Sequence, residues 1–263
     1  MKARLLFALA LLGFVQPAFA AARFTIVNVN APGIGFNDPT AAVPVGGNTG
    51  TTVGEQRLIA FQYAADLWGA ALDSGVEIRV QASFEPLACT ATAATLGSAG
   101  PLSVMDNFDG AGYVNTWYTV AEANKLAGVD QDPDGNDIRA RFNANLGTPT
   151  CLAASSWYYG LDTNQVPGQI NLVAVLLHEF AHGLGFLSLG NLVGTATNPV
   201  GSLFFEQTDI FLKYYKDNTT GLVSDEMTTA QRGQSFINPR NVVWVGDRVT
   251  SSVPSVLSPE LRC

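Results

Sequence analysis

Residues 172–186 have the sequence LVAVLLHEFAHGLGF. The run up to residue 182 is almost entirely apolar and contains neither Gly nor Pro, which predicts a helix buried on nearly all sides. Gly183 and Gly185 then end it, because glycine does not favour helix continuation and readily takes the left-handed conformation that closes a helix.

This helix carries the pattern His178-Glu179-Phe-Ala-His182, and the chain has no other histidine. Helix positions four apart lie one turn apart on the same face, so both imidazoles can reach one Zn²⁺ at about 2.0–2.1 Å. Glu179 emerges beside them, where a carboxylate can deprotonate a metal-activated water as general base and pass the proton to the leaving amine as general acid. The alternative is two core histidines beside an unrelated Glu, which would need matched partners for three buried ionisable groups.

The sequence HEFAHGLGF that begins at His178 resembles the active-site helix of the metzincin metallopeptidases, whose pattern is HExxHxxGxxH. His178, Glu179, His182 and Gly185 match four of its five fixed positions. The resemblance implies that the two histidines are zinc ligands, that Glu179 is the catalytic acid and base, and that Gly185 is the turn that redirects the chain. Ser188 stands where the family has its third histidine.

Three alternatives stay open for the third zinc ligand. Asp209, or less strongly Glu206, would complete a site of two histidines and one carboxylate, although both also suit ordinary charges at a helix end. In the second alternative the chain resembles the leishmanolysin-like branch, where a distant histidine and methionine turn follow an insertion; that region would lie beyond Cys263. In the third, Ser188 or a water takes the position and the protein is a weak or inactive relative.

Wider stretches also resemble secreted bacterial leishmanolysin-like proteins. The resemblance implies an α+β fold: a metzincin-like (zincin) catalytic domain with a mixed twisted sheet, a backing helix and the buried active-site helix. It also implies an edge strand that binds substrate as an added β-strand, for which we expect residues 138–143 (IRARFN). The stretches that carry the resemblance are 89–101, YYGLD at 158–162, HEFAHGLGFLS at 178–188, DNTTGL at 217–222, MTTAQR at 227–232 and NVVWVG at 241–246.

Hydrophobic periodicity predicts the other elements. The clearest helix covers 52–72, where Thr52 and Glu55 have capping-box spacing and Leu58 lies on the apolar face with Phe61, Ala65, Trp68 and Leu72. Alternating apolar residues predict strands, and residues 85–117 read as mostly loop. The expected strands are 23–30, 76–84, 138–143 and 242–245, and the further expected helices are 120–127, 209–215 and 228–237.

The N-terminus has the pattern of a secretory signal. A short positive region with Lys2 and Arg4 precedes an apolar run too short to span a bilayer, and Ala-Phe-Ala at 18–20 is a small-x-small cleavage site. We expect residues 1–20 to be removed and the mature chain to be secreted or periplasmic. We further expect a catalytic domain over 21–225. Residues 226–263 would be a C-terminal extension, or the start of an inserted or incomplete domain.

An exported protein folds in an oxidising environment, where its cysteines can form disulfide bonds. The chain has three cysteines. Cys89 and Cys151 are the natural disulfide pair, and the loop they would close stabilises the fold by about 4 kcal/mol in the chain-entropy model. Cys263 is left over at the end of the sequence. The alternative is that all three are free thiols.

A second metal is considered at Asp130, Asp132 and Asp134, which are spaced like the start of a calcium loop. The twelfth loop position is Arg141 rather than a bidentate Glu, which excludes an EF-hand. A looser Ca²⁺ site and a solvated turn stay open, and we favour the turn.

The composition and charge of the chain exclude some classes of binding partner. The chain has 263 residues and a net charge of −8, without a basic stripe, which argues against nucleic acid. No segment after the signal has the length and apolar character of a membrane span. The sequence therefore predicts a secreted, zinc-dependent metallopeptidase that acts on a protein or peptide. The alternative is a weak or inactive secreted binding or surface protein that keeps the HExxH helix.

Overall fold

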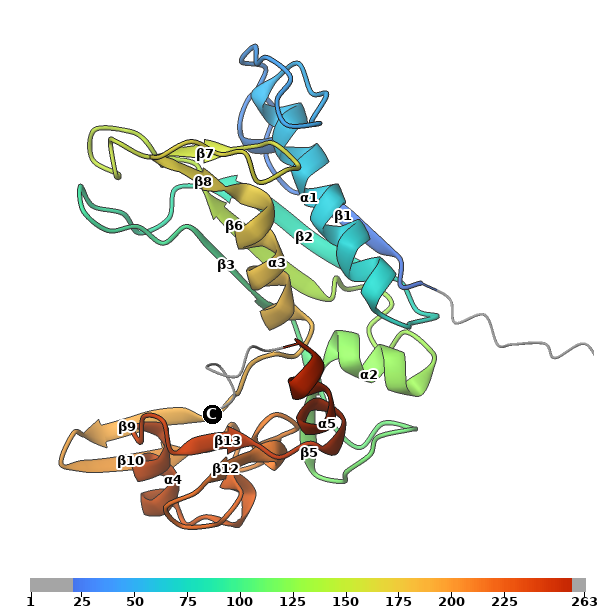
Figure 1. Cartoon of the computed structure of the whole chain (residues 1–263). Helices are drawn as coiled ribbons and strands as arrows, with labels where there is room; N and C mark the ends of the chain where they lie inside the picture. Colours follow the sequence, from blue (N-terminus) through green and yellow to red (C-terminus); the bar gives the residue numbers. More distant parts are fainter. Residues whose placement is uncertain (1–20, 257–263) are drawn as a thin grey trace, which may run out of the picture.

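The computed structural model describes residues 21–256 and combines helices with mixed sheets, so the predicted α+β class is confirmed (Figure 1). The expected signal segment 1–20 and Cys263 lie outside the described residues. None of the helices within 21–256 has both the length and the apolar composition needed to cross a bilayer.

A four-stranded sheet forms the upper part of Figure 1, in the order β1-β2-β6-β3. Strands β1 (Phe24–Asn28), β2 (Ile78–Glu85) and β6 (Ile138–Asn143) run parallel to one another, and β3 (Gly97–Pro101) is antiparallel to β6. The strands predicted at 23–30, 76–84 and 138–143 are therefore confirmed.

Strands β1 and β3 are the two edges of this sheet, so the expectation that residues 138–143 form an edge was wrong. Strand β6 lies inside the sheet, paired on both sides. The sequence of β3, GSAGP, has no β-branched or aromatic residue and reads as loop. Packing makes it a strand: a Cβ added at Gly97 would lie only 2.9 Å from the Phe142 ring, so the small residue permits close approach to β6. Its Pro101 is tolerated in an edge strand.

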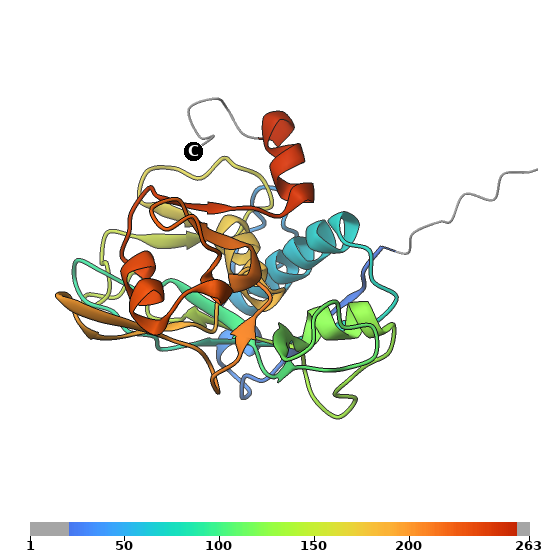
Figure 2. The same cartoon turned by 90° about the horizontal axis from the view of Figure 1, so that it is seen from below.

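Two helices, α1 (Val53–Ala71) and α3 (Leu172–Gly183), lie side by side against the sheet (Figures 1 and 2). The core between these layers is rich in phenylalanine. Phe61 of α1 contacts the rings of Phe84 on β2, Phe142 on β6 and Phe180 on α3, with centroid distances of 5.0–6.0 Å. These rings are almost fully buried, and they fix α3 against the sheet.

Helix α1 has the predicted capping box, in which Thr52 and Glu55 satisfy each other's backbone N–H groups. Its buried stripe differs from the expected one, because Leu58 is 38% exposed and Arg57 is buried. The Arg57 guanidinium lies 4.4 Å from the centre of the Phe84 ring and donates to the Gly35 carbonyl at 2.9 Å. Arg57 can lie on the buried face of α1 because its guanidinium has the Phe84 ring and the Gly35 carbonyl as partners there. Hydrophobic periodicity does not predict a buried arginine.

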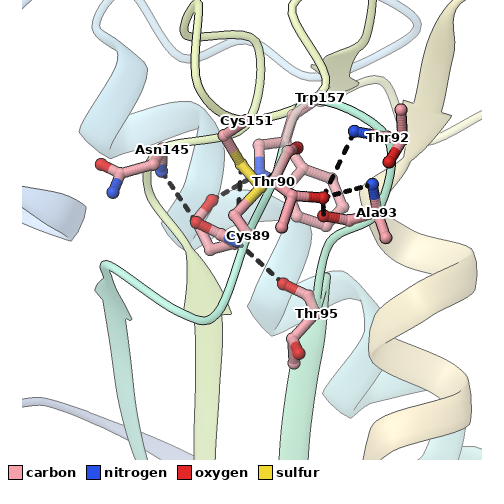
Figure 3. Close-up of a disulfide and its surroundings, with 9 residues drawn as sticks. Cys89, Thr90, Thr92, Ala93, Thr95, Asn145, Cys151 and Trp157 are labelled. Atoms are coloured by element: carbon pink, nitrogen blue, oxygen red, sulfur yellow. Dashed lines mark hydrogen bonds between the residues drawn. A yellow bond between two sulfur atoms is a disulfide. The ribbon is translucent and has the colours of Figure 1, made fainter.

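The predicted disulfide between Cys89 and Cys151 is confirmed (Figure 3). It holds the loop that leads into β3, and two hydrogen bonds join the same loop to β6. The Asn143 side chain donates to the Thr95 carbonyl at 2.9 Å, and the Asn143 N–H donates to the Leu96 carbonyl at 2.9 Å. The entry to the edge strand is therefore fixed covalently and by hydrogen bonds.

The rest of the chain forms smaller units, several of which lie in the lower part of Figure 1. Helix α2 (Val120–Ala127) has the predicted bounds, and α4 (Thr229–Phe236) is one residue shorter at each end than predicted. Residues 209–215 do not form the predicted helix but a short strand, a 3-10 turn and the start of another strand. That segment runs past Asp209, whose buried carboxylate holds the turn instead of a helix end. The remaining elements are η1 (Gly35–Asn37), β4 (Val104–Met105), β5 (Thr116–Thr119), α2 (Val120–Ala127), β7 (Ser156–Tyr158), β8 (Gln169–Asn171), β9 (Asn191–Thr195), β10 (Asn198–Ser202), β11 (Thr208–Asp209), η2 (Leu212–Tyr214), β12 (Tyr215–Asp217), η3 (Ser224–Glu226), α4 (Thr229–Phe236), β13 (Val242–Trp244) and α5 (Asp247–Val256).

Helix α4 packs on strand β10 through Arg232. The buried Arg232 guanidinium donates to the carbonyls of Gly201, Ser224 and Met227 at 2.8–3.0 Å. Residues on both sides of position 225 therefore belong to one packed unit.

Candidate functional site

Helix α3 presents the HExxH residues on the face turned away from the core. Its N-cap is Asn171, whose side chain accepts from the Ala174 N–H at 3.0 Å. Leu172, Leu176 and Phe180 are fully buried, whereas His178 is exposed. Glu179 and His182 are half-buried. The expectation that α3 is buried on nearly all sides thus holds for one face only, and the other face is available for chemistry.

The structure brings the two predicted zinc ligands together. The Nε2 atoms of His178 and His182 lie 3.2 Å apart. The Nδ1 atom of His182 lies 2.8 Å from the carbonyl oxygen of Phe186. A carbonyl can only accept a hydrogen bond, so Nδ1 of a neutral His182 carries the proton and its Nε2 carries the lone pair, which faces Nε2 of His178. That lone pair is what a metal ligand requires.

The histidine pair fits two of the ligand positions of zinc. Two nitrogens bound at about 2.0–2.1 Å to one tetrahedral zinc ion lie about 3.3 Å apart, which is close to the 3.2 Å between the Nε2 atoms. Ligating histidines commonly donate their other ring N–H to a backbone carbonyl or a carboxylate, which fixes the tautomer and the ring orientation. The Phe186 carbonyl does this for His182.

Glu179 points toward the edge strand. Its Oε2 accepts a hydrogen bond from the Ala99 N–H of β3 at 3.0 Å. A groove of about 440 Å³ lies at this place between α3 and the start of β3. It is lined by Thr95, Leu96, Gly97, Ala174, Val175, His178 and Glu179. His178 and the candidate base Glu179 therefore open onto the same groove, beside the edge strand β3.

The turn after α3 requires glycine at position 185. Gly185 has a φ of +117°, and an added Cβ would lie 2.4 Å from the carboxylate of Glu122. That carboxylate caps α2 by accepting from the N–H and the hydroxyl of Thr119. Burial raises the pKa of Glu122, against the lowering effect of the Thr119 hydrogen bonds. Because Gly185 packs closely against the Glu122 carboxylate, this contact fixes the position of the next residue, Phe186, whose carbonyl contacts His182.

The predicted third ligand, Asp209, is buried and already hydrogen-bonded. Its Oδ2 accepts from the Ser188 hydroxyl at 3.1 Å and from the Leu189 N–H at 2.7 Å, and its Oδ1 accepts from the Leu212 N–H at 2.9 Å. Burial raises its pKa, which these hydrogen bonds oppose. Glu206 is exposed, in a turn with a φ of +59°.

Within residues 21–256 no three His, Cys, Asp or Glu side chains are arranged to hold a metal ion. The structure therefore does not bring Asp209 or Glu206 together with the histidine pair. Ser188, the other alternative, donates its hydroxyl to Asp209 and accepts from the Gly190 N–H at 2.9 Å.

The three carboxylates considered for calcium are not gathered into a metal-binding group in the described part of the chain either. Asp130 accepts from the Asp132 N–H at 2.9 Å, and the Gly135 N–H donates to the Asp132 carbonyl at 2.9 Å, which forms a tight turn ahead of β6. Asp134 lies exposed on this turn. Asp137, which the sequence analysis did not single out, is buried beside Asn124, and burial raises its pKa.

Three parts of the site had no signal in the sequence. The Ala99 N–H and the Phe186 carbonyl are backbone groups, which any residue type supplies. Glu122 lies within the expected helix 120–127, and its close approach to Gly185 joins positions 63 apart in the chain. A search of protein-family models, of curated proteins and of solved structures finds no match to this chain.

Proposed function

We propose that this protein is a secreted zinc metallopeptidase with a metzincin-like catalytic domain. The observation that supports it most is the pair of Nε2 atoms 3.2 Å apart beside a carboxylate at an open sheet edge. The export part of the proposal rests on the signal-like N-terminus, and the family part on the HEFAHGLGF stretch.

His178 and His182 would hold the zinc ion, which supplies Lewis acidity for activating a water and polarising a carbonyl. The hydrogen bond from Nδ1–H of His182 to the carbonyl of Phe186 orients the His182 ring. The third protein ligand is unassigned within residues 21–256. Glu179 takes a proton as general base and returns it to the leaving amine. For that role Glu179 exchanges its hydrogen bond with the Ala99 N–H for one with the reacting groups.

The substrate would be an extended peptide added to β3. Because β3 is the sheet edge next to α3, its outward backbone groups can pair with a peptide strand. A peptide bound in the groove of about 440 Å³ would lie beside His178 and Glu179, which line it. The proposed substrate-binding edge is therefore β3, residues 97–101, instead of the expected residues 138–143.

A second candidate function is a secreted binding or surface protein that keeps the helix without turnover. It is favoured by the hydrogen bonding of Asp209, whose two carboxylate oxygens are both committed to the loop and turn around it. Such a protein could bind a peptide at β3 and leave it intact.

Hydrolysis of a casein or a mixed peptide pool by the purified chain separates the two functions. A peptidase cleaves the pool, is inhibited by a zinc chelator and is restored by added zinc. The control variant is Glu179→Gln, which removes the base and keeps both histidines, so it retains zinc and loses cleavage. Zinc binding without cleavage in the wild-type chain supports the binding protein, and cleavage that persists in Glu179→Gln contradicts the mechanism.

A further inference from the structure

A second pocket, of about 330 Å³, lies apart from the groove that His178 and Glu179 line. Residues from the end of α1, from α2 and from the start of α5 line it, and its volume is at the low end of the range for pockets that bind small ligands. Its apolar lining includes Leu72, Ile78 and Leu184, the last of which directly precedes the Gly185 turn. Its charged lining consists of Asp73, Glu122, Lys125 and Arg248.

The four charged side chains of this pocket include one ion pair and two charges without a partner. Nζ of Lys125 lies 3.4 Å from Oδ2 of Asp73. Neither Glu122 nor Arg248 forms an ion pair with any residue in 21–256. The pocket therefore offers one carboxylate and one guanidinium to a ligand, on either side of an apolar lining.

The environment of the Glu122 carboxylate favours a cation. Its Oε2 accepts the two capping hydrogen bonds from Thr119, whereas its Oε1 accepts none from the part of the chain that the structure describes. Burial raises the pKa of Glu122, against the hydrogen bonds from Thr119, and the negative charge of Asp209 raises it further. A carboxylate removed from water without a counter-ion is costly, and an ammonium group in the pocket would supply that counter-ion.

We propose that this pocket binds a free α-amino acid with an apolar side chain, as the zwitterion. The ammonium group of the ligand pairs with Glu122, its carboxylate pairs with Arg248, and its side chain covers the apolar lining. A ligand with a single charge would leave Glu122 or Arg248 unpaired, and a ligand without an apolar part would leave the lining in contact with water. Free amino acids are among the products of peptide hydrolysis, but their binding here does not depend on the proposed peptidase activity.

Isothermal titration calorimetry of the purified chain with L-leucine at pH 7 tests the proposal. We expect Arg248→Ala to raise the Kd of leucine about fivefold, because Arg248 is exposed, and Glu122→Gln to raise it about tenfold, because Glu122 is half-buried. Arg139→Ala is the matched control: Arg139 is also exposed and has no ion pair within residues 21–256, but it lies on β6 outside the pocket, so the Kd should not change. Glycine, which lacks the apolar side chain, should bind at least about tenfold more weakly than leucine.

Two analogues of leucine assign each charge. The amine 3-methylbutylamine lacks the carboxylate, so Arg248→Ala should not weaken its binding, and 4-methylpentanoate lacks the ammonium group, so Glu122→Gln should not weaken its binding.

The proposal is overturned if leucine does not bind the wild-type chain, or if Arg248→Ala leaves its Kd unchanged. It is also overturned if 3-methylbutylamine binds as tightly as leucine, because that result would show a site for a cation alone. Arg248 is exposed, so its variant decides the matter even where Glu122→Gln fails to fold. None of these ligands has a peptide bond, so the outcome is independent of whether the chain cleaves peptides.

Discussion

Replacing Gly185 with Ala adds one methyl group to the turn that leaves α3. The backbone φ of +117° costs a residue with a Cβ about 1–3 kcal/mol. The new Cβ would also lie 2.4 Å from the Glu122 carboxylate, which must move and give up its cap of α2, at a further cost of about 1 kcal/mol. We therefore expect a loss of about 2–4 kcal/mol in the free energy of unfolding, measured by urea denaturation.

Gly221→Ala is the matched control, since Gly221 also has a positive φ, of +73°, but an added Cβ meets no atom within 4 Å. It should cost about 1–2 kcal/mol from backbone strain alone. The contact with Glu122 is isolated by adding Glu122→Ala to Gly185→Ala, where the two costs should be less than additive. A loss in Gly185→Ala no greater than in Gly221→Ala, or strict additivity with Glu122→Ala, would show that the close approach of Gly185 to Glu122 does not contribute to stability.

The same change has a consequence for the metal. The Gly185 turn carries the carbonyl of Phe186 to Nδ1 of His182, so a shifted turn loosens that hydrogen bond. Loss of a partner of this kind lowers metal affinity by about 10–100-fold. Under folding conditions, Gly185→Ala should therefore bind zinc more weakly than Gly221→Ala in a chelator competition.

Three other variants test the fold. Thr52→Ala removes the cap of α1 and should lower the free energy of unfolding by about 1 kcal/mol in a urea titration, without a change in m. Replacing both Cys89 and Cys151 with Ser removes a disulfide that joins positions 62 apart in the sequence, and should lower the free energy of unfolding by about 4 kcal/mol. A loss below about 1 kcal/mol would show that this cross-link does not stabilise the fold. Burial raises the pKa of Asp217, but its hydrogen bonds outweigh burial and hold the pKa below the ordinary 3.8. Its carboxylate therefore stabilises the fold above pH 3.8, and this stability is lost as the pH falls through the lowered pKa. Asp217→Asn should be less stable than wild type at pH 7, and the difference should shrink below pH 3.8 in urea titrations across this range.

Elements with strong local signals were predicted well. The capping box at Thr52, the strand at residues 138–143 and the helix at residues 120–127 each have a period or a cap that acts within a few residues. The Cys89–Cys151 pair followed from the count of cysteines and the expected export. Local sequence is sufficient where neighbours in the chain supply the stabilising contacts.

Elements that depend on distant contacts were missed. Strand β3 has small residues and a proline, and only pairing with β6 makes it a strand. The helix expected at 209–215 was wrong, because the buried Asp209 carboxylate organises the loop after α3 and the turn at Leu212 at the same time. Neither contact leaves a pattern in the sequence.

In the candidate site, too, the parts that depend on local sequence were predicted and the parts that depend on distant contacts were not. HExxH spacing is a local property of a helix, so His178, Glu179 and His182 were found from the sequence, and the structure places the two Nε2 atoms together. The groups that orient them, the carbonyl of Phe186 and the N–H of Ala99, are backbone atoms delivered by the fold.

Zinc stoichiometry and affinity of the purified chain, measured by elemental analysis and chelator competition, test directly whether the histidine pair binds zinc. We expect one zinc per wild-type chain, retention in Glu179→Gln, and losses of at least about 100-fold in affinity for His178→Ala and His182→Ala. Asp209→Ala is the informative fourth variant: sharply lower affinity would assign it as the third ligand, whereas wild-type affinity would place that ligand elsewhere. A chain that binds no zinc, or that binds it equally without His178 and His182, would show that the histidine pair is not a zinc site.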